Sequence, residues 1–112
     1  MILDDYLKKQ QTWFLETFGP GNRDDGLIAH IDDEFQEIRD SPGDIEEWID
    51  IVILGFEGAL RNAKGNDLER VLAVVDCLRM NQEKNIARVW PDWKTADLEK
   101  PIMHIQGNGD NR

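Results

Sequence analysis

The chain has 112 residues, a formal charge of −10, 40% hydrophobic residues and four tryptophans. This length predicts one domain, and the apolar fraction predicts a folded core rather than disorder. The negative charge argues against a nucleic-acid duplex or an anionic membrane as partner, because both repel an acidic surface. It suits a protein that recruits cations.

Targeting signals are not evident in the sequence. The start, "MILDDYLKKQ", carries acids where a signal peptide has a basic region, and the longest apolar run, Ile51 to Leu54, is too short to span a membrane. Cys77 is the single cysteine, so no internal disulfide is expected. A reducing cytoplasm is the simplest location.

The hydrophobic pattern predicts four helices separated by segments rich in Gly, Pro, Asn and Asp. They are expected at 2–17, at 24–39, from Ser41–Pro42 or an Asp44 N-cap to about 63, and at about 68–89. In the fourth helix the expected apolar stripe is Leu68, Leu72, Val75 and Ile86. No strand is expected, because "IVIL" lies inside twenty residues without a turn signal. The predicted fold class is all-α, a four-helix bundle with an irregular segment after "WPDW".

Four carboxylates near the centre of the sequence form two matched pairs. Glu34 and Glu37 form E-x-x-E in the second helix, and Glu47 and Asp50 form E-x-x-D in the third. A spacing of three places each pair on one helical face. The short connection through "SPGD" predicts an antiparallel hairpin, in which residues equally far from the turn lie at the same height. Position 42 is the midpoint of both pairs taken across the hairpin: Glu37 with Glu47, and Glu34 with Asp50.

The third helix is apolar around nearly its whole circumference, and its polar strip is therefore expected to face the interior or an interface. That strip consists of Glu47, Asp50, Glu57 and Arg61, with Leu54 among them. Four like charges brought together away from solvent would repel or protonate, and divalent cations resolve this conflict. Oxygen ligands without a matching His or Cys set favour Mg²⁺, or Mn²⁺, over zinc.

Two other interpretations of these acids are open. Carboxylates spaced by three on helices are mostly solvated surface residues. Glu47 is also placed to be the third-position partner of an Asp44 capping box. The registered pairing of two such motifs, one beside a fully apolar run, strengthens the metal hypothesis against both.

A polar and basic strip lies on the fourth helix. Asn81, Lys84 and Arg88 follow a helical spacing and define one face. A solvent-exposed face is the simpler interpretation. In an acidic protein with a metal cluster, the same strip also suits the binding of phosphates that the metal bridges. No P-loop is present, because "GPGNRDDG" lacks its spacing and its Lys-Ser/Thr ending.

Three longer blocks carry a family resemblance. "TFGPGNRDDGLIAHIDDEFQEI", "DIEEWIDIVILGFEGALR" and "NQEKNIARVWPDW" occur in this order. The "EFQE…EEWID" signature resembles that of the MazG-like all-α nucleoside triphosphate pyrophosphatases, and the longer blocks resemble the phage dATP/dGTP diphosphohydrolases related to MazZ. The similarity covers roughly residues 10 to 104. The nine residues between Glu37 and Glu47 are few for MazG proteins at large and imply a tighter hairpin.

The resemblance implies roles for individual residues. The metal ligands would be Glu34, Glu37, Glu47 and Asp50, and the phosphate-binding residues would be Lys84, Asn85 and Arg88, with Asn81 on the same face. The early block implies a nucleotide pocket with Trp13, Arg23 and His30; for Trp13, packing of the first helix is an equal alternative to stacking on the base. The implied domain is 1–103, followed by a disordered tail at 104–112. The implied assembly is a homodimer or homotetramer in the cytoplasm of a bacterium or a phage-infected cell.

The expected reaction is Mg²⁺-dependent hydrolysis of a purine (d)NTP between the α and β phosphorus atoms, giving (d)NMP and pyrophosphate. Metal ions would activate and orient the attacking water and offset charge on the leaving group. Glu34 or Glu37 would accept the proton of that water, while Lys84 and Arg88 would stabilise phosphate oxygens. The rival hypothesis is a non-enzymatic acidic interaction protein or nucleic-acid mimic, which requires acids that point outward and are dispersed.

Overall fold

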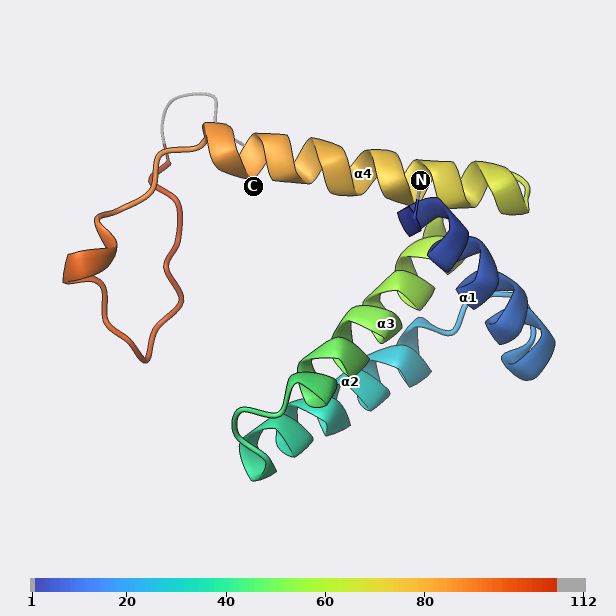
Figure 1. Ribbon diagram of the computed structural model, residues 1–112, viewed down its shortest axis with the longest axis horizontal. Coiled ribbons are helices and arrows are strands. Elements are labelled where there is room, and N and C mark those ends of the chain that lie inside the picture. The colour runs from blue at the N-terminus through green and yellow to red at the C-terminus, as the bar shows by residue number, and fades with distance from the viewer. Residues whose placement is uncertain (1, 107–112) are drawn as a thin grey trace. The chain divides into compact units, whose positions relative to one another are not determined.

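The computed structural model describes residues 2–106 and contains four α-helices (Figure 1). They are α1 (Ile2–Phe18), α2 (Asp24–Asp40), α3 (Ile45–Asn62) and α4 (Asp67–Ala87), followed by a short 3-10 helix, η1 (Trp93–Thr95). Within the described range, the β-pairing is a single isolated bridge between Val89 and Ile105. The prediction of an all-α fold with four helices is confirmed. No helix in this range combines the length and hydrophobicity that crossing a membrane requires.

The chain divides between Cys77 and Leu78 into two compact units. The first unit holds α1, α2, α3 and the beginning of α4. The second holds the end of α4, η1 and the segment that follows it. All residues of the acidic pairs belong to the first unit.

The core of the first unit joins one face of α1 to α3 and the beginning of α4. Its buried members are Leu7, Phe14, Leu60, Val71 and Val74. Two buried glutamines connect the same helices, since the Gln10 amide donates to the carbonyl of Ile53 (2.8 Å) and the Gln11 amide donates to that of Asp67 (2.9 Å). These bonds give acceptors to two amide nitrogens that the packing of α1 buries.

The apolar stripe expected for the fourth helix is wrong at Leu68, Leu72 and Ile86, which are exposed, whereas its fourth member, Val75, packs against the core. Val71 and Val74 are buried instead. The two stripes are adjacent on the helix, and the choice between them depends on how the helix packs on Leu7 and Leu60, which periodicity alone does not determine.

Local capping determines where α3 and α4 begin. Of the two proposed starts for α3, Asp44 is the N-cap, and its side chain accepts a hydrogen bond from the backbone N–H of Glu46 (3.0 Å). Gly43 precedes it with φ +85°, a conformation that a residue with a Cβ adopts at a cost. At α4, Asn66 and Glu69 form a reciprocal capping box with bonds of 2.9 and 3.0 Å.

The second unit explains why α4 is shorter than expected. The helix was predicted to reach Val89, but it ends at Ala87. The Val89 carbonyl instead accepts a hydrogen bond from the N–H of Ile105 (2.7 Å), which requires extended backbone. His104 is buried and meets the Trp90 ring edge to face, with centroids 5.8 Å apart. A disordered tail was predicted at 104–112. Of these residues, 107–112 lie outside the part of the chain that the structure describes.

Candidate active site

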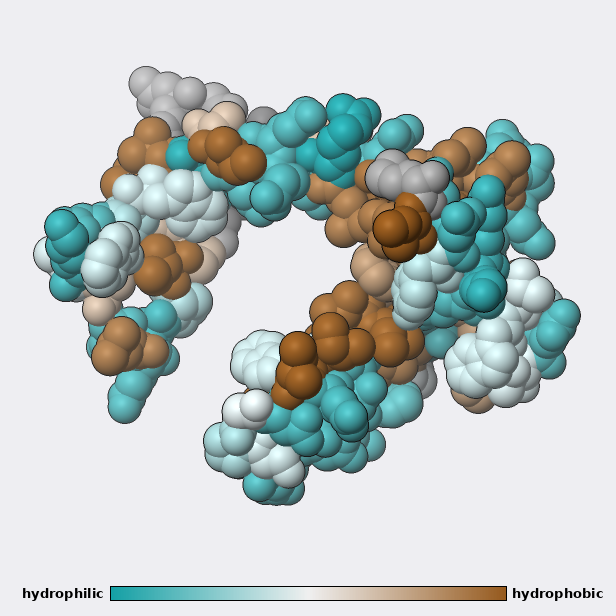
Figure 2. All heavy atoms as spheres, viewed as in Figure 1, coloured by the Kyte–Doolittle hydropathy of each residue, from teal (hydrophilic) through white to brown (hydrophobic). Residues whose placement is uncertain are grey.

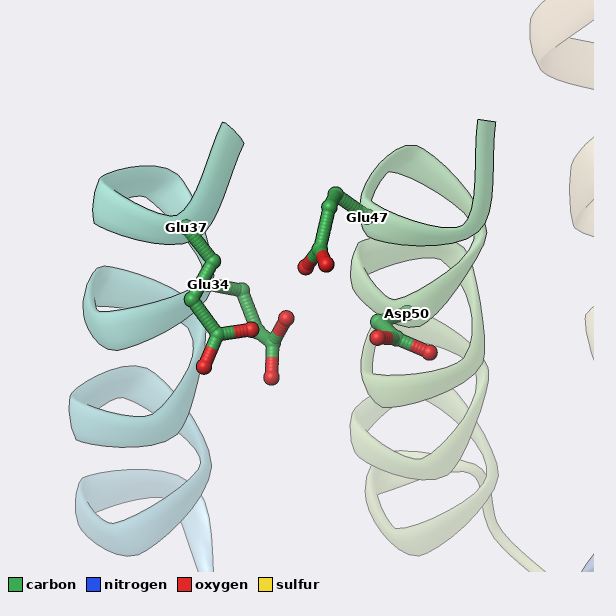
Figure 3. A group of neighbouring side chains, drawn as sticks. All are labelled: Glu34, Glu37, Glu47 and Asp50. Carbon is green, nitrogen blue, oxygen red and sulfur yellow. The ribbon is translucent and has the colours of Figure 1, made fainter. Parts of the chain in front are cut away.

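The two acidic pairs face each other across the α2–α3 hairpin (Figure 3). α2 and α3 run side by side, joined by the short turn at 41–44 (Figure 1). One carboxylate oxygen from each of four residues lies within 4.8 Å of all the others; these residues are Glu34, Glu37, Glu47 and Asp50. Residues equally far from position 42 were expected to lie at the same height along the hairpin, and these four acids do converge on a common centre.

Electrostatics at this centre disfavour four free carboxylates. Burial raises the pKa of Glu34, and a hydrogen bond with Glu37 together with the charges of Glu37 and Asp50 raises it further. A hydrogen bond with Glu37, then burial and the charges of neighbouring acids, raise the pKa of Glu47 to about 7. The site thus holds protons more tightly than ordinary carboxylates do, because burial and the neighbouring negative charges disfavour the ionised forms.

The cluster fits a divalent cation. Within residues 2–106, Glu34 Oε2 and Glu47 Oε2 are buried and have no hydrogen-bond partner. Ligand oxygens around one Mg²⁺ stand about 2.1 Å from the ion and hence at most about 4.2 Å apart. A cluster 4.8 Å across therefore needs only small side-chain rotations to close on an ion. An all-oxygen donor set of this kind is typical of Mg²⁺ or Mn²⁺.

The capping-box alternative for Glu47 is not what the structure contains. In a capping box the Glu47 side chain would accept from the backbone N–H of Asp44, but that N–H donates to the carbonyl of Ser41 (3.3 Å). Asp44 caps the helix through Glu46 instead. Glu47 is consequently available to the acidic cluster.

A cavity of about 460 Å³ adjoins the cluster within the first unit. It is lined by Trp13, Phe18, Arg23, Gly26, Leu27, His30, Glu34, Asp50, Ile53, Leu54 and Glu57. The structure thus brings the three residues assigned to a nucleotide pocket, Trp13, Arg23 and His30, to one cavity that also includes two acids of the cluster. Its volume and largely apolar lining are typical of a site for a small organic ligand.

His30 connects the cavity to the acidic cluster. Its Nε2 lies 3.3 Å from Glu34 Oε1, one helical turn away on α2. Because this contact uses Oε1, the partnerless oxygen of Glu34 is Oε2. The contact therefore orients the Glu34 carboxylate and leaves one oxygen for another ligand.

Phe18 had no role in the sequence-based interpretation, whereas Glu57 and Arg61 belong to the polar strip of the third helix that was expected to face the interior or an interface. Phe18 meets the ring of Trp13 edge to face at 5.2 Å and so supports the aromatic wall of the cavity. Glu57 is buried and accepts a hydrogen bond from Arg61 Nε at 2.9 Å. Both side chains of this pair are buried, as expected for that strip.

The four basic and polar residues assigned to phosphate binding belong to the second unit. They are Asn81, Lys84, Asn85 and Arg88. The Arg88 guanidinium donates to Asn85 Oδ1 (3.3 Å), and the Trp90 indole donates to the Asn85 carbonyl (2.7 Å). Their role in binding phosphate stays a prediction.

Comparison with known proteins identifies the family. The family model for dATP/dGTP pyrophosphohydrolase matches residues 6–109, which is nearly the whole chain. No curated protein and no solved structure matches it. The resemblance seen in the sequence is confirmed, and the helical fold is consistent with a MazG-like pyrophosphatase. The chain belongs to the dATP/dGTP pyrophosphohydrolase family, and it is a pyrophosphate-releasing hydrolase.

Proposed function

We propose that this protein hydrolyses dATP and dGTP between the α and β phosphorus atoms, giving the deoxynucleoside monophosphate and pyrophosphate. The observation that carries the proposal is the convergence of four carboxylates beside a cavity of nucleotide size. Family membership supplies the substrate class. A nucleic-acid mimic needs dispersed, outward-facing acids, so this convergence does not favour the rival hypothesis.

The proposed metal ligands are Glu34, Glu37, Glu47 and Asp50, and the proposed ion is Mg²⁺, with Mn²⁺ as a substitute. When bound, such an ion polarises phosphate oxygens and lowers the pKa of a coordinated water. The four carboxylate ligands come from two helices of one short hairpin. This arrangement is rigid, because only the turn at 41–44 separates the two pairs. Rigid positioning of this kind lowers the entropy that must be lost in the transition state.

The proposed chemistry is an in-line displacement. A water oxygen forms a bond to one phosphorus while the bridging oxygen leaves with the other phosphoryl group. Glu34 or Glu37 accepts the proton that the water loses. Glu34 is the better enclosed of these two acids, since it is 7% exposed and its Oε1 is oriented by His30.

We place the nucleoside in the 460 Å³ cavity. Trp13 is half exposed and has one face available for stacking, because its contact with Phe18 is edge to face. Arg23 and His30 complete the polar lining nearest to it. The phosphate chain would lie at the acids, and Asn81, Lys84, Asn85 and Arg88 are the proposed phosphate ligands from the second unit.

The proposal includes assembly into a homodimer or homotetramer. One face of α3 exposes Ile45, Trp48, Ile49 and Val52. These positions follow the i, i+3, i+4, i+7 spacing of a single face, on the side of the helix opposite Glu47, Leu54 and Glu57. Figure 2 shows hydrophobic side chains gathered along this helix. A contiguous apolar face of this kind supports association with another copy.

The proposed setting is nucleotide-pool control or purine-modified DNA synthesis in the cytoplasm of a bacterium or a phage-infected cell. The resemblance of the sequence to the phage branch supports this setting. The substrates themselves are cytoplasmic metabolites.

The first experiment incubates the purified protein with dATP, dGTP, dCTP and dTTP, with and without Mg²⁺, and identifies the products by chromatography. We expect deoxynucleoside monophosphate and pyrophosphate from the purines, only with the metal. Formation of diphosphate and orthophosphate would assign the wrong bond, and the absence of any product would refute the function.

The second experiment tests the ligand assignment with Glu47→Gln. We expect kcat/KM to fall by more than about a hundredfold, since loss of even an outer-sphere partner of a metal costs about 10- to 100-fold. The matched control is Glu46→Gln, because Glu46 is the exposed neighbour whose side chain is outside the cluster. Equal activity of the two variants would contradict the assignment.

A further inference from the structure

Glu57 is a buried acid that the metal cluster does not use. It is 6% exposed and lines the same cavity as Asp50. It follows Asp50 by seven residues on α3, which is about 10 Å along the axis at about 1.5 Å per residue. This separation is comparable with the distance from the α-phosphate of a nucleotide to the far edge of its base.

Arg61 fixes the position of Glu57. Its Nε donates to Glu57 Oε2 at 2.9 Å, and both side chains are more than nine-tenths buried. Another nitrogen of the same guanidinium donates to the carbonyls of Gly19 (2.8 Å) and Gly21 (3.0 Å). The guanidinium also lies over the Phe14 ring, 4.6 Å from its centroid. The carboxylate is thereby held against the loop that continues to Arg23.

The second carboxylate oxygen of Glu57, Oε1, is not used by Arg61. Within the described part of the chain, Arg61 is the hydrogen-bond partner of Oε2, and Oε1 has none. Oε1 is not fully buried, so it is accessible to solvent or ligand. Since Glu57 lines the cavity, this oxygen is an acceptor available to a cavity ligand.

The other cavity residues make this acceptor distinctive. His30, Glu34 and Asp50 belong to the end of the cavity at the acidic cluster. The remaining lining side chains are apolar, except for the hydrogen-bond donors of Trp13 and Arg23. Glu57 is therefore the side-chain acceptor that the described cavity offers away from the phosphate end.

We propose that Glu57 is a specificity-determining residue that accepts a hydrogen bond from the amino group of the purine base. This inference rests on the proposed function, which places the nucleoside in this cavity. A carboxylate is an acceptor only, and adenine presents its 6-amino group while guanine presents N1–H and its 2-amino group. The donors lie at position 6 in adenine and at positions 1 and 2 in guanine, so one acceptor meets both bases only if the two are shifted relative to each other in the cavity.

The test compares dATP with the 5′-triphosphate of unsubstituted purine deoxyriboside, which lacks the amino group. For the wild type we expect kcat/KM to favour dATP by roughly ten- to a hundredfold, the discrimination typical of a well-placed hydrogen bond to a base edge. In Glu57→Gln, the amide oxygen takes the place of Oε2 and still accepts from Arg61. The amide nitrogen then takes the place of Oε1, so the base meets a donor instead of an acceptor. We expect the ratio to fall to about one.

The outcomes separate this inference from the proposed function. Equal loss of activity toward both triphosphates in Glu57→Gln would mean that Glu57 only neutralises Arg61, and would overturn the inference. A wild type without preference for dATP would overturn it independently of whether the variant folds. Titration with Mn²⁺ should give the same affinity for wild type and variant. Failure of the wild type to hydrolyse any deoxynucleotide would refute the proposed function itself.

Discussion

Glu37 and Glu47 face each other from α2 and α3 and share a side-chain hydrogen bond, which is the largest cause of the raised pKa of Glu47 (Figure 3). Two carboxylates share such a bond only when one of them carries a proton. A proton and a bound cation would both offset the same repulsion between these acids. Metal binding and protonation of this pair are therefore competing events.

Metal affinity should consequently depend on pH near neutrality. Because the pKa of Glu47 is about 7, a proton must leave before the cation binds at lower pH. We expect the dissociation constant for Mn²⁺ to rise by up to about tenfold per pH unit below 7 and to change little above pH 8. Calorimetric titration at pH 6.0, 7.0 and 8.0, in two buffers of different ionisation enthalpy, measures both the affinity and the released proton. An affinity independent of pH between 6 and 8 would contradict the shared proton.

The stability of the metal-free protein should change with pH in the direction opposite to that of an ordinary salt-bridged acid. The pKa of Glu47 rises from 4.5 to about 7 on folding, so the folded state binds more protons within this window. Its contribution to stability is fully present below pH 4.5 and is lost as the pH rises through about 7. Glu34, whose pKa is also raised, acts in the same direction.

Urea unfolding in EDTA at pH 5.5 and pH 8.0 measures this effect. Other groups titrate as well, so the readout is the difference between wild type and Glu47→Gln, which resembles the protonated acid. We expect the wild type to lose more stability than the variant on going to pH 8.0, and Mg²⁺ to restore the wild type alone. Parallel pH profiles of the two proteins would contradict the pKa assignment.

Local sequence signals were sufficient for the helices and the acidic centre. Gly43 and the Asp44 cap make a short turn, and a short turn between two helices fixes their relative height. Simple midpoint arithmetic on the pairs Glu37–Glu47 and Glu34–Asp50 therefore placed four carboxylates together. No contact between distant segments was needed for that prediction.

Contacts between distant segments were not predictable from the same signals. Arg61 bonds to Gly19 and Gly21, which lie about forty positions earlier, and no periodicity marks such a pairing. The stripe of α4 was assigned to Leu72 instead of Val71 for the same reason, because the packing partner on α1 decides which face is buried. Burial of Glu57 and Arg61 was expected from their place on the polar strip of the third helix, but their bonds to each other and to the loop were not.

Substitution of Lys84 or Arg88 by alanine should raise the KM for dATP and leave metal binding unchanged. Each would remove a charge-assisted contact to phosphate, which corresponds to a roughly 10- to 100-fold loss of affinity. The matched control is Arg79→Ala on the same helix, where an exposed arginine lies 3.4 Å from Glu83. Steady-state kinetics and Mn²⁺ titration check both parts. An equal effect of all three variants would indicate a general charge effect rather than phosphate contacts.

The exposed face of α3 should be an interface between copies of this chain. Ile49 lies between Ile45, Trp48 and Val52 on that face, so Ile49→Glu would place an unpaired charge inside the contact, where its desolvation is costly. We expect sedimentation at micromolar concentration to show a dimer or tetramer for the wild type and a monomer for this variant. Ile28→Glu is the matched control, because Ile28 is similarly exposed (58%) but lies on α2 outside this face. A monomeric wild type would refute the interface, whereas dissociation by both variants would place it on α2 as well as α3.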